Sequence, residues 1–101
     1  MERGGFVYIM ASCRNGTLYL GVTSDLMRRV SQHRATEIDG FTKRHDVKRL
    51  VWFEQFADIR AAIAREKQMK GWKRAWKLRV IQEGNIAWRD LTLDLGFPPL
   101  E

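Results

Sequence analysis

Cysteine is almost absent from this sequence, because Cys13 is the only one among 101 residues. An intrachain disulfide is therefore excluded, and so is a zinc site built on cysteine pairs. No apolar run approaches the ~20 residues that a membrane helix needs, and the N-terminus leads directly into a strand pattern with no signal peptide. We found no internal repeat or low-complexity stretch. The sequence thus predicts one folded domain in the cytoplasm, with no membrane partner.

Negative charge is in deficit, because 18 Lys and Arg residues outnumber 12 Asp and Glu residues and leave a net charge of +6. The isoelectric point is about 10.0. This balance in a short domain favours a polyanionic partner. Charge alone does not establish nucleic-acid binding, since many basic domains bind nothing acidic. The hydrophobic fraction of 45% is ordinary for a folded globule and argues against disorder.

A β-hairpin is predicted near the N-terminus. Two short apolar runs, at 6–12 and 18–22, flank the dipeptide Asn15-Gly16. Asn-Gly between apolar runs indicates a type I′ turn, because both central residues of that turn need positive φ.

The two tyrosines of the chain fall on one face of this hairpin. The register expected from a type I′ turn pairs Tyr8 with Thr23, and paired residues share a face. Tyr8 and Tyr19 would then lie about four residues, or roughly 13 Å, apart along the strands. They could border one pocket, although two core aromatics with their hydroxyls at the rim explain the hairpin pattern more simply.

Helices and one further strand are predicted downstream. Ser24 or Asp25 caps the first helix and Asp58 the second, while Gly84 ends the last. The predicted elements are a helix to about Ala35, a polar loop Thr36–Arg44, a strand Lys48–Phe56, helices Ile59–Lys70 and Lys73–Gln82, and a helical turn within Trp88–Leu95. The order β-β-α-β-α-α is typical of an α+β domain with a small antiparallel or mixed sheet. We assign residues 1–93 to this domain and 94–101 to a C-terminal tail.

Polar side chains interrupt the apolar stripe of the first helix. Leu26 and Val30 should face the core, and Arg29 and His33 flank them at helical spacing. Taken singly, Arg29 is explained by a side chain that reaches solvent from the edge of the stripe, and His33 by a hydrogen-bonded core histidine.

Glu66 interrupts the stripe of the second helix in the same way, three residues from both Ile63 and Met69. A carboxylate on a core face is costly unless it is paired or binds a metal. A buried Glu–Arg pair and a metal ligand are both open interpretations. Together with the arginine, the histidine and the tyrosines, this carboxylate completes a set that could hydrolyse a phosphodiester.

The spacing of these residues resembles that of the GIY-YIG nuclease superfamily. The resemblance begins with the triplets Val7-Tyr8-Ile9 and Tyr19-Leu20-Gly21 and covers about residues 5–91. It is greatest with small stand-alone members related to the nuclease domains of DNA-repair and homing endonucleases. Two departures, Val7 for glycine and Leu20 for isoleucine, are apolar and leave the tyrosines in place.

What the resemblance implies is a three-stranded antiparallel sheet flanked by helices and one divalent metal ion, Mg²⁺ or Mn²⁺. It implies a metal-dependent endonuclease acting on DNA, with RNA not excluded, and with low sequence specificity because no DNA-reading domain follows. The catalytic positions carried over are Tyr8, Tyr19, Arg29, His33, Glu66 and Asn85. Glu66 would be the metal ligand, Arg29 would hold the phosphate, and Tyr8 would be the favoured base. Asn85 is more readily explained as a residue that positions a loop.

Substrate binding is expected from basic residues spread over several elements. Many of them could equally be ordinary solvated surface charges. The expected nucleic-acid-binding residues are Arg28, Arg34, Lys43, Arg44, His45, Lys70, Lys73, Arg74 and Lys77. Trp72 and Trp76, four residues apart on a helix, are predicted to be core residues in preference to base-stacking platforms.

Two rival functions remain open at this point. One is a non-catalytic nucleic-acid-binding module on the same scaffold, and the other is a protein-interaction domain whose basic face contacts an acidic partner. A protein partner could also supply the specificity that a single nuclease domain lacks.

Overall fold

The computed structural model describes residues 4–35 and 46–100. Its elements are β1 (Gly5–Ala11), β2 (Leu18–Thr23), α1 (Leu26–Arg34), β3 (Arg49–Phe56), α3 (Ile59–Lys70), α4 (Arg74–Gly84) and the 3₁₀ helix η1 (Leu91–Leu95). The three strands form one antiparallel sheet in the order β2-β1-β3. This confirms the predicted α+β fold and the order of its elements. Lys43, Arg44 and His45 lie outside the described residues, as does the predicted loop from Thr36.

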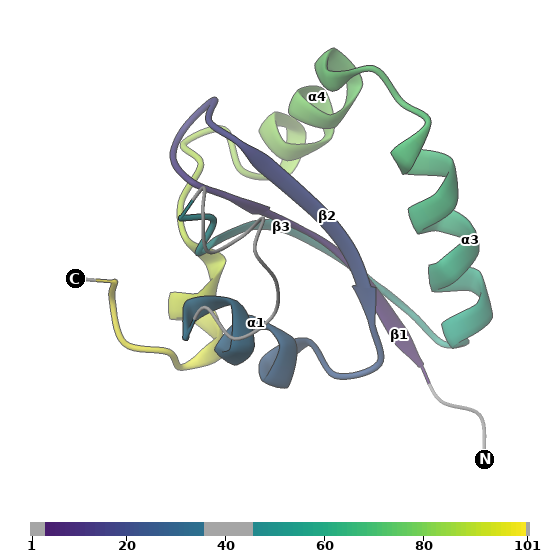
Figure 1. Cartoon of the computed structure of the whole chain (residues 1–101), viewed down its shortest axis with the longest axis horizontal. Helices are drawn as coiled ribbons and strands as arrows, with labels where there is room; N and C mark the ends of the chain where they lie inside the picture. The colour runs from purple at the N-terminus through teal and green to yellow at the C-terminus, as the bar shows by residue number, and fades with distance from the viewer. Residues whose placement is uncertain (1–3, 36–45, 101) are drawn as a thin grey trace.

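Helices cover both faces of the sheet. Figure 1 shows α1 and η1 on one face and α3 and α4 on the other. The central strand β1 supplies both layers: Val7 and Ile9 belong to the core beneath α3 and α4, whereas Tyr8 and Met10 belong to the core beneath α1 and η1. Within the described ranges, no helix has the length and apolarity needed to cross a membrane.

The hairpin register differs from the prediction by two residues. Tyr8 pairs with Gly21, and Met10 pairs with Tyr19. The cause is the connection, which spans residues 12–17 instead of a two-residue turn. Asn15 has a φ of 58°, but Gly16 does not adopt positive φ, so no type I′ turn forms. A shift of two residues keeps every side chain on its predicted face but brings the tyrosines closer together.

Strand β3 contains an irregularity that places apolar side chains on both faces. Ile9 pairs with Trp52 and Met10 with Leu50, so Val51 has no direct partner on β1. Such a bulge turns neighbouring side chains toward the same face. Val51 and Trp52 both pack in the core beneath α3 and α4, while Leu50 packs in the opposite one.

The two helices that directly follow strands, α1 and α3, each have an aspartate as N-cap. The carboxylate of Asp25 accepts the N–H of Arg28 at 3.1 Å, and that of Asp58 accepts the N–H of Arg60 at 2.8 Å. These contacts satisfy amides that have no partner inside the helix. Hydrogen bonds from the side chain and the backbone of Arg60 also lower the pKa of Asp58. The predicted cap at Asp58 is confirmed, and the choice at the first helix is Asp25.

The prediction that both tryptophans of the α3–α4 segment are core residues is wrong for one of them. Trp72 is half-buried and packs against the core beneath α3 and α4, but Trp76 is 53% exposed. Their rings meet edge to face with centroids 6.2 Å apart. The prediction placed both on one helix, but Trp72 lies before α4 begins at Arg74, so their spacing of four residues does not put them on one helix side.

Candidate active site

A tyrosine–histidine hydrogen bond lies at the centre of the site. Tyr8 Oη and His33 Nε2 are 3.0 Å apart, and the two residues are 1% and 0% exposed. Tyr8 comes from the central strand, and His33 comes from the last turn of α1, which covers the same face. The structure therefore brings these two predicted site residues together, with His33 as a hydrogen-bonded buried histidine.

Gly21 makes room for the Tyr8 ring. A Cβ atom at Gly21 would lie 2.5 Å from Tyr8 Oη and 2.6 Å from Tyr8 Cζ. Real Cβ atoms do not approach other atoms this closely, so the phenol crosses β2 only because residue 21 has no side chain. The site does not depend on the conformational freedom of Gly21, since its φ is not positive. Its lack of volume is what positions Tyr8.

Tyr19 completes an aromatic cluster on the same face. Its ring centroid is 4.8 Å from that of His33 and 6.3 Å from that of Tyr8, within the range of favourable aromatic pairs. Tyr19 is half-buried, whereas Tyr8 is buried. Of the two tyrosines, Tyr19 is therefore the one with substantial access to solvent.

Arg29 lies one helical turn before His33 and is also half-buried. Its guanidinium has no hydrogen-bond or ion-pair partner among residues 4–35 and 46–100. A half-buried arginine without a carboxylate partner can bind an anion through its fork of donors. Its neighbour Arg28 is exposed.

Glu66 is a nearly buried carboxylate on α3. Its side chain is 12% exposed, and its Oε2 lies 3.3 Å from Lys70 Nζ in an i,i+4 pair. A buried Glu–Arg pair was one interpretation of the sequence, but the nearby Arg65 pairs with Glu54 instead. No group of three or more His, Cys, Asp or Glu side chains in the described ranges could hold a metal. A cation at Glu66 would therefore take most ligands from water and substrate.

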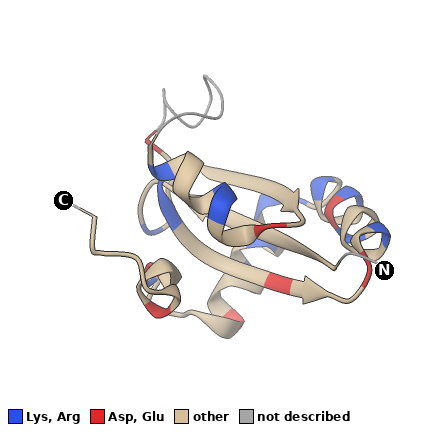
Figure 2. Ribbon diagram, turned by 90° about the horizontal axis from the view of Figure 1, so that it is seen from below, with Lys and Arg blue, Asp and Glu red and all other residues tan. Residues whose placement is uncertain are grey.

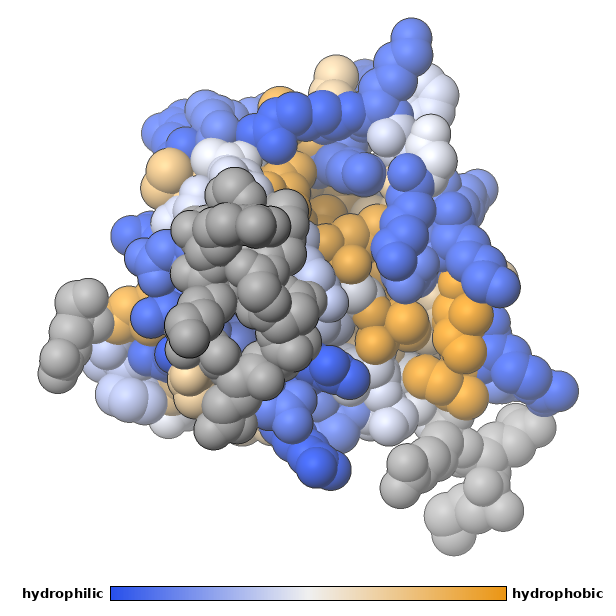
Figure 3. Space-filling model, in the orientation of Figure 1, coloured by the Kyte–Doolittle hydropathy of each residue, from blue (hydrophilic) through white to orange (hydrophobic). Residues whose placement is uncertain are grey.

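The predicted catalytic residues occupy two layers of the molecule. Tyr8, Tyr19 and His33 lie on the face covered by α1, whereas Glu66 shares its helix with Ala62 and Met69 of the opposite core. β2 is an edge strand, and α3 packs across both β1 and β2. Because α3 contacts this edge strand, its outer edge is a place where side chains from the two layers could meet. Figure 3 shows apolar side chains between hydrophilic groups where Figure 1 draws this strand.

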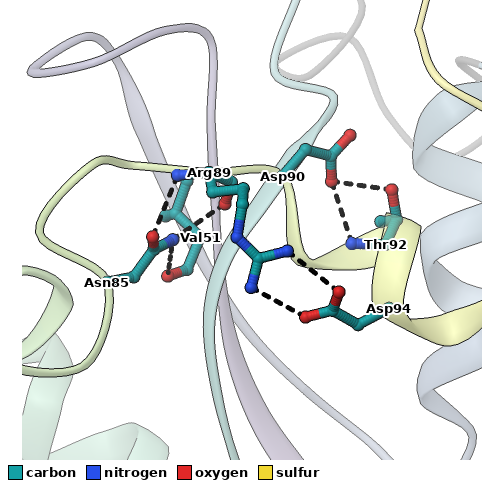
Figure 4. Close-up of polar contacts among 6 residues, drawn as sticks. All are labelled: Val51, Asn85, Arg89, Asp90, Thr92 and Asp94. Carbon is teal, nitrogen blue, oxygen red and sulfur yellow. Dashed lines mark hydrogen bonds and ion pairs between the residues drawn. The ribbon is translucent and has the colours of Figure 1, made fainter.

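Asn85 lies away from the aromatic cluster and ties a loop to β3. Its Nδ2 donates to the carbonyl oxygens of Val51 at 3.1 Å and Arg89 at 2.8 Å, while its Oδ1 accepts the N–H of Arg89 at 2.9 Å (Figure 4). Val51 is the bulge residue of β3. Every polar atom of this amide side chain is thus engaged with backbone, which is the arrangement of a loop-positioning residue.

A buried polar junction beside this loop was not found from the sequence. Asp90 Oδ1 accepts the N–H of Thr92 at 3.0 Å and the Thr92 hydroxyl at 2.7 Å (Figure 4). It also accepts the N–H of Leu50 at 3.3 Å. Asp90 is the N-cap of η1. Aspartate two residues before threonine is a recognisable capping signal, and it could have located the start of this short helix.

The predicted basic residues divide into engaged and solvated ones. Arg34 donates to the carbonyl of Pro98 at 2.5 Å and lies over the Phe97 ring, so it holds the C-terminal segment. Arg74 donates to the carbonyls of Asn15 and Gly16 in the hairpin loop. Basic residues mark α1 and α3 in Figure 2. Of the remaining predicted residues, Arg28, Lys70 and Lys73 are exposed and Lys77 is half-buried.

Comparisons with known proteins relate this chain to one family of domains. Residues 4–79 match the family model of the GIY-YIG catalytic domain. A UPF0213 protein of Haloquadratum walsbyi is 38% identical over 78% of this chain and 88% of its own, and one of Natronomonas pharaonis is 37% identical over 82% and 96%. The solution NMR structure of a UPF0213 protein from Bacillus halodurans is similar with a TM-score of 0.55 and 26% identity, covering 88% of this chain and 94% of that one. None of these relatives' names states an activity.

Proposed function

The chain belongs to the GIY-YIG nuclease family, and on that premise we propose that it is a metal-dependent endonuclease that hydrolyses DNA phosphodiester bonds with low sequence specificity. One observation carries this proposal. The buried Tyr8–His33 hydrogen bond packs against the half-exposed Tyr19, one helical turn from an arginine without a partner in the described residues. These are the parts needed to activate water and to stabilise a phosphoryl transition state.

In this proposal Tyr19 contacts the attacking water. A base must come within about 2.6–3.2 Å of the proton that it removes, and Tyr8 is 1% exposed with its hydroxyl already bonded to His33. This revises the sequence-based expectation that Tyr8 is the base. Tyr8 and His33 become positioning residues, since the His33 ring packs against Tyr19 and Tyr8 holds that ring in place.

Arg29 binds the scissile phosphate. Its fork of donors can hold two phosphate oxygens and offset the charge that grows in the transition state. Removal of one such donor in other enzymes costs about 10²–10³ in rate.

Glu66 is the residue that would hold Mg²⁺ or Mn²⁺. Magnesium is commonly bound by one or two carboxylates, with waters and phosphate oxygens as the other ligands, and a nearly buried carboxylate paired only with an exposed lysine among the described residues fits that requirement. Bound there, the ion supplies positive charge that polarises the phosphate and stabilises the leaving oxygen. The reaction would take place at the outer edge of β2, where the layers of Tyr19 and Glu66 adjoin.

The test is to measure cleavage of labelled single-stranded and duplex DNA in Mg²⁺, Mn²⁺ or EDTA. Binding of the same DNA is measured in parallel. We expect cleavage only with metal, and a loss of about 100-fold or more in Glu66→Gln and Arg29→Lys. Arg79→Lys is the matched control, because Arg79 is exposed on α4 and pairs with Glu83, and it should stay within a few-fold of wild type. Binding without cleavage under every condition would identify a non-catalytic nucleic-acid-binding module. Equal cleavage by Glu66→Gln would exclude Glu66 as the metal ligand.

A further inference from the structure

Trp76 presents an indole to solvent on the first turn of α4. It is 53% exposed, and the other tryptophans of the chain, Trp52, Trp72 and Trp88, are half-buried or buried. The edge-to-face contact with Trp72 supports the Trp76 indole from one side. The Trp72 ring is contacted in turn by Arg65 of α3, whose guanidinium lies 5.0 Å from the ring centre. The exposed ring is therefore held in place while much of its surface remains open.

Three basic residues lie close to Trp76 in the sequence, at the N-terminal end of α4. Lys73 lies one turn before Trp76 and is exposed, and Lys77 follows it directly. Arg74 donates to two carbonyl oxygens, of Asn15 at 2.9 Å and Gly16 at 2.6 Å. It forms no ion pair with a carboxylate in the described ranges. An open aromatic ring beside unneutralised cations is the combination with which proteins hold a base and its phosphates.

A hollow lies beside these cations, between the hairpin loop and α4. It measures about 530 Å³ and is lined by Arg74, Lys77 and the hairpin residues 15–18, none of them acidic. Figure 1 shows the hairpin loop and α4 at the same end of the molecule. The last lining residue, Leu18, directly precedes Tyr19 on β2, a spacing of about 3.3 Å along a strand. Leu18 packs in the core beneath α3 and α4 and Tyr19 packs on the opposite face, so a chain of phosphates in the hollow would reach Tyr19 around the outer edge of β2.

We propose that Trp76 stacks on an unpaired base of a single-stranded nucleic acid whose phosphates lie in the hollow between α4 and the hairpin. The inference rests on the proposed function, because it names the substrate class of the same active site. A base inside a duplex is stacked on both neighbours, so its face is not available to an external indole. The preferred substrate therefore carries a single-stranded segment next to the phosphate that is cut.

Binding in EDTA tests this inference apart from cleavage. Anisotropy of labelled single-stranded DNA, single-stranded RNA and blunt duplex DNA is measured with wild type, Trp76→Ala, Trp76→Phe and Ile86→Ala. We expect Trp76→Ala to bind the single strands roughly 5- to 100-fold more weakly, Trp76→Phe to recover most of that loss, and duplex affinity to change little. Ile86→Ala is the control, because Ile86 is 74% exposed yet lies beyond the other end of α4. The DNA and RNA arms show whether the sugar matters.

Tryptophan emission gives a second measurement that does not depend on the alanine variant folding. A single strand should quench the emission of wild type, and that quenching should be lost in Trp76→Phe at saturating oligonucleotide. Equal losses for single-stranded and duplex DNA in Trp76→Ala, or unchanged binding, would overturn the inference. A protein that binds single strands through Trp76 but cuts nothing would keep this inference and remove the endonuclease, and cutting that is indifferent to Trp76 would do the reverse.

Discussion

At the scale of single residues, the site depends on where one side chain is missing. Tyr8 reaches His33 because Gly21, directly opposite on β2, leaves the space that the phenol crosses. The sequence could place Tyr8, Tyr19 and the glycine on one face, because side chains alternate along a strand. It could not bring the tyrosine rings into contact, because that required the true register.

Gly21→Ala should disrupt the site through volume alone. The new methyl group would lie 2.5 Å from Tyr8 Oη, and Tyr8 is too buried to move aside. We expect the free energy of unfolding to fall by about 1–3 kcal/mol and cleavage to be lost, as measured by denaturant titration and a single-turnover assay. Gly84→Ala is the matched control, since no described atom lies within 4 Å of the added Cβ. A stable, active Gly21→Ala protein would contradict the proposed packing of Tyr8.

The two tyrosines should respond differently to loss of the hydroxyl. Tyr8→Phe removes the buried bond to His33, so unfolding free energy should fall by about 1 kcal/mol and cleavage should fall roughly 10-fold through misplacement of His33 and Tyr19. Tyr19→Phe should leave stability nearly unchanged and reduce cleavage by about 100-fold or more, as expected for the base. Thermal unfolding and single-turnover rates measure the pair. The reverse pattern would return Tyr8 to the role of base.

At the scale of elements, turn chemistry is where sequence reasoning failed. Asn15-Gly16 predicted a two-residue turn, but Ser12 accepts the Thr17 N–H through its side chain and donates its own N–H to the Thr17 carbonyl. This side-chain bond closes a longer loop, and the register moves by two residues. Strands and helices with strong periodicity were predicted correctly, because their apolar stripes depend on spacing and not on the connection.

The Asn85 loop is an element held by one side chain. Asn85→Ala removes three hydrogen bonds to the backbone of Val51 and Arg89, so we expect a loss of about 2–3 kcal/mol in denaturant unfolding. Gln82→Ala, an exposed change on α4, should stay within about 0.5 kcal/mol. Assayed where it is fully folded, Asn85→Ala should cleave within a few-fold of wild type. A 100-fold loss there would instead support the catalytic role that the resemblance implies.

At the scale of the whole molecule, the layers and the charge decide what binds where. Helical periodicity showed that Glu66 is out of place on a core face, but it could not tell which face of the sheet that core covers. The structure puts α1 and α3 on opposite faces (Figure 1), so a shared site could form where α3 contacts the edge strand β2. The prediction for Trp76 failed for another reason: Trp72 lies before α4, so the two tryptophans do not share a helix.

The net charge of +6 should make nucleic-acid binding strongly salt-dependent. Each phosphate contact contributes roughly 0.7 to the slope of log affinity against log salt for a single strand. Removal of two contacts in Lys73→Gln/Lys77→Gln should therefore reduce the slope by roughly 1.4, measured by anisotropy at several salt concentrations. Arg79→Gln on the same helix is the control, because Arg79 lies 3.6 Å from Glu83 in an ion pair. An equal change in the control would argue for diffuse charge in place of a defined track.

In the proposed function, residues from both layers form one metal-assisted site at the outer edge of β2. Titration of ¹⁵N-labelled protein with Mn²⁺ tests it most directly, because the paramagnetic ion broadens the resonances of nearby amides. We expect broadening around Glu66 that extends to Tyr19 on β2 and Arg29 on α1, and we expect this broadening to be lost in Glu66→Gln. Broadening confined to α3, with β2 and α1 unaffected, would contradict the claim and separate Glu66 from the tyrosine–arginine site.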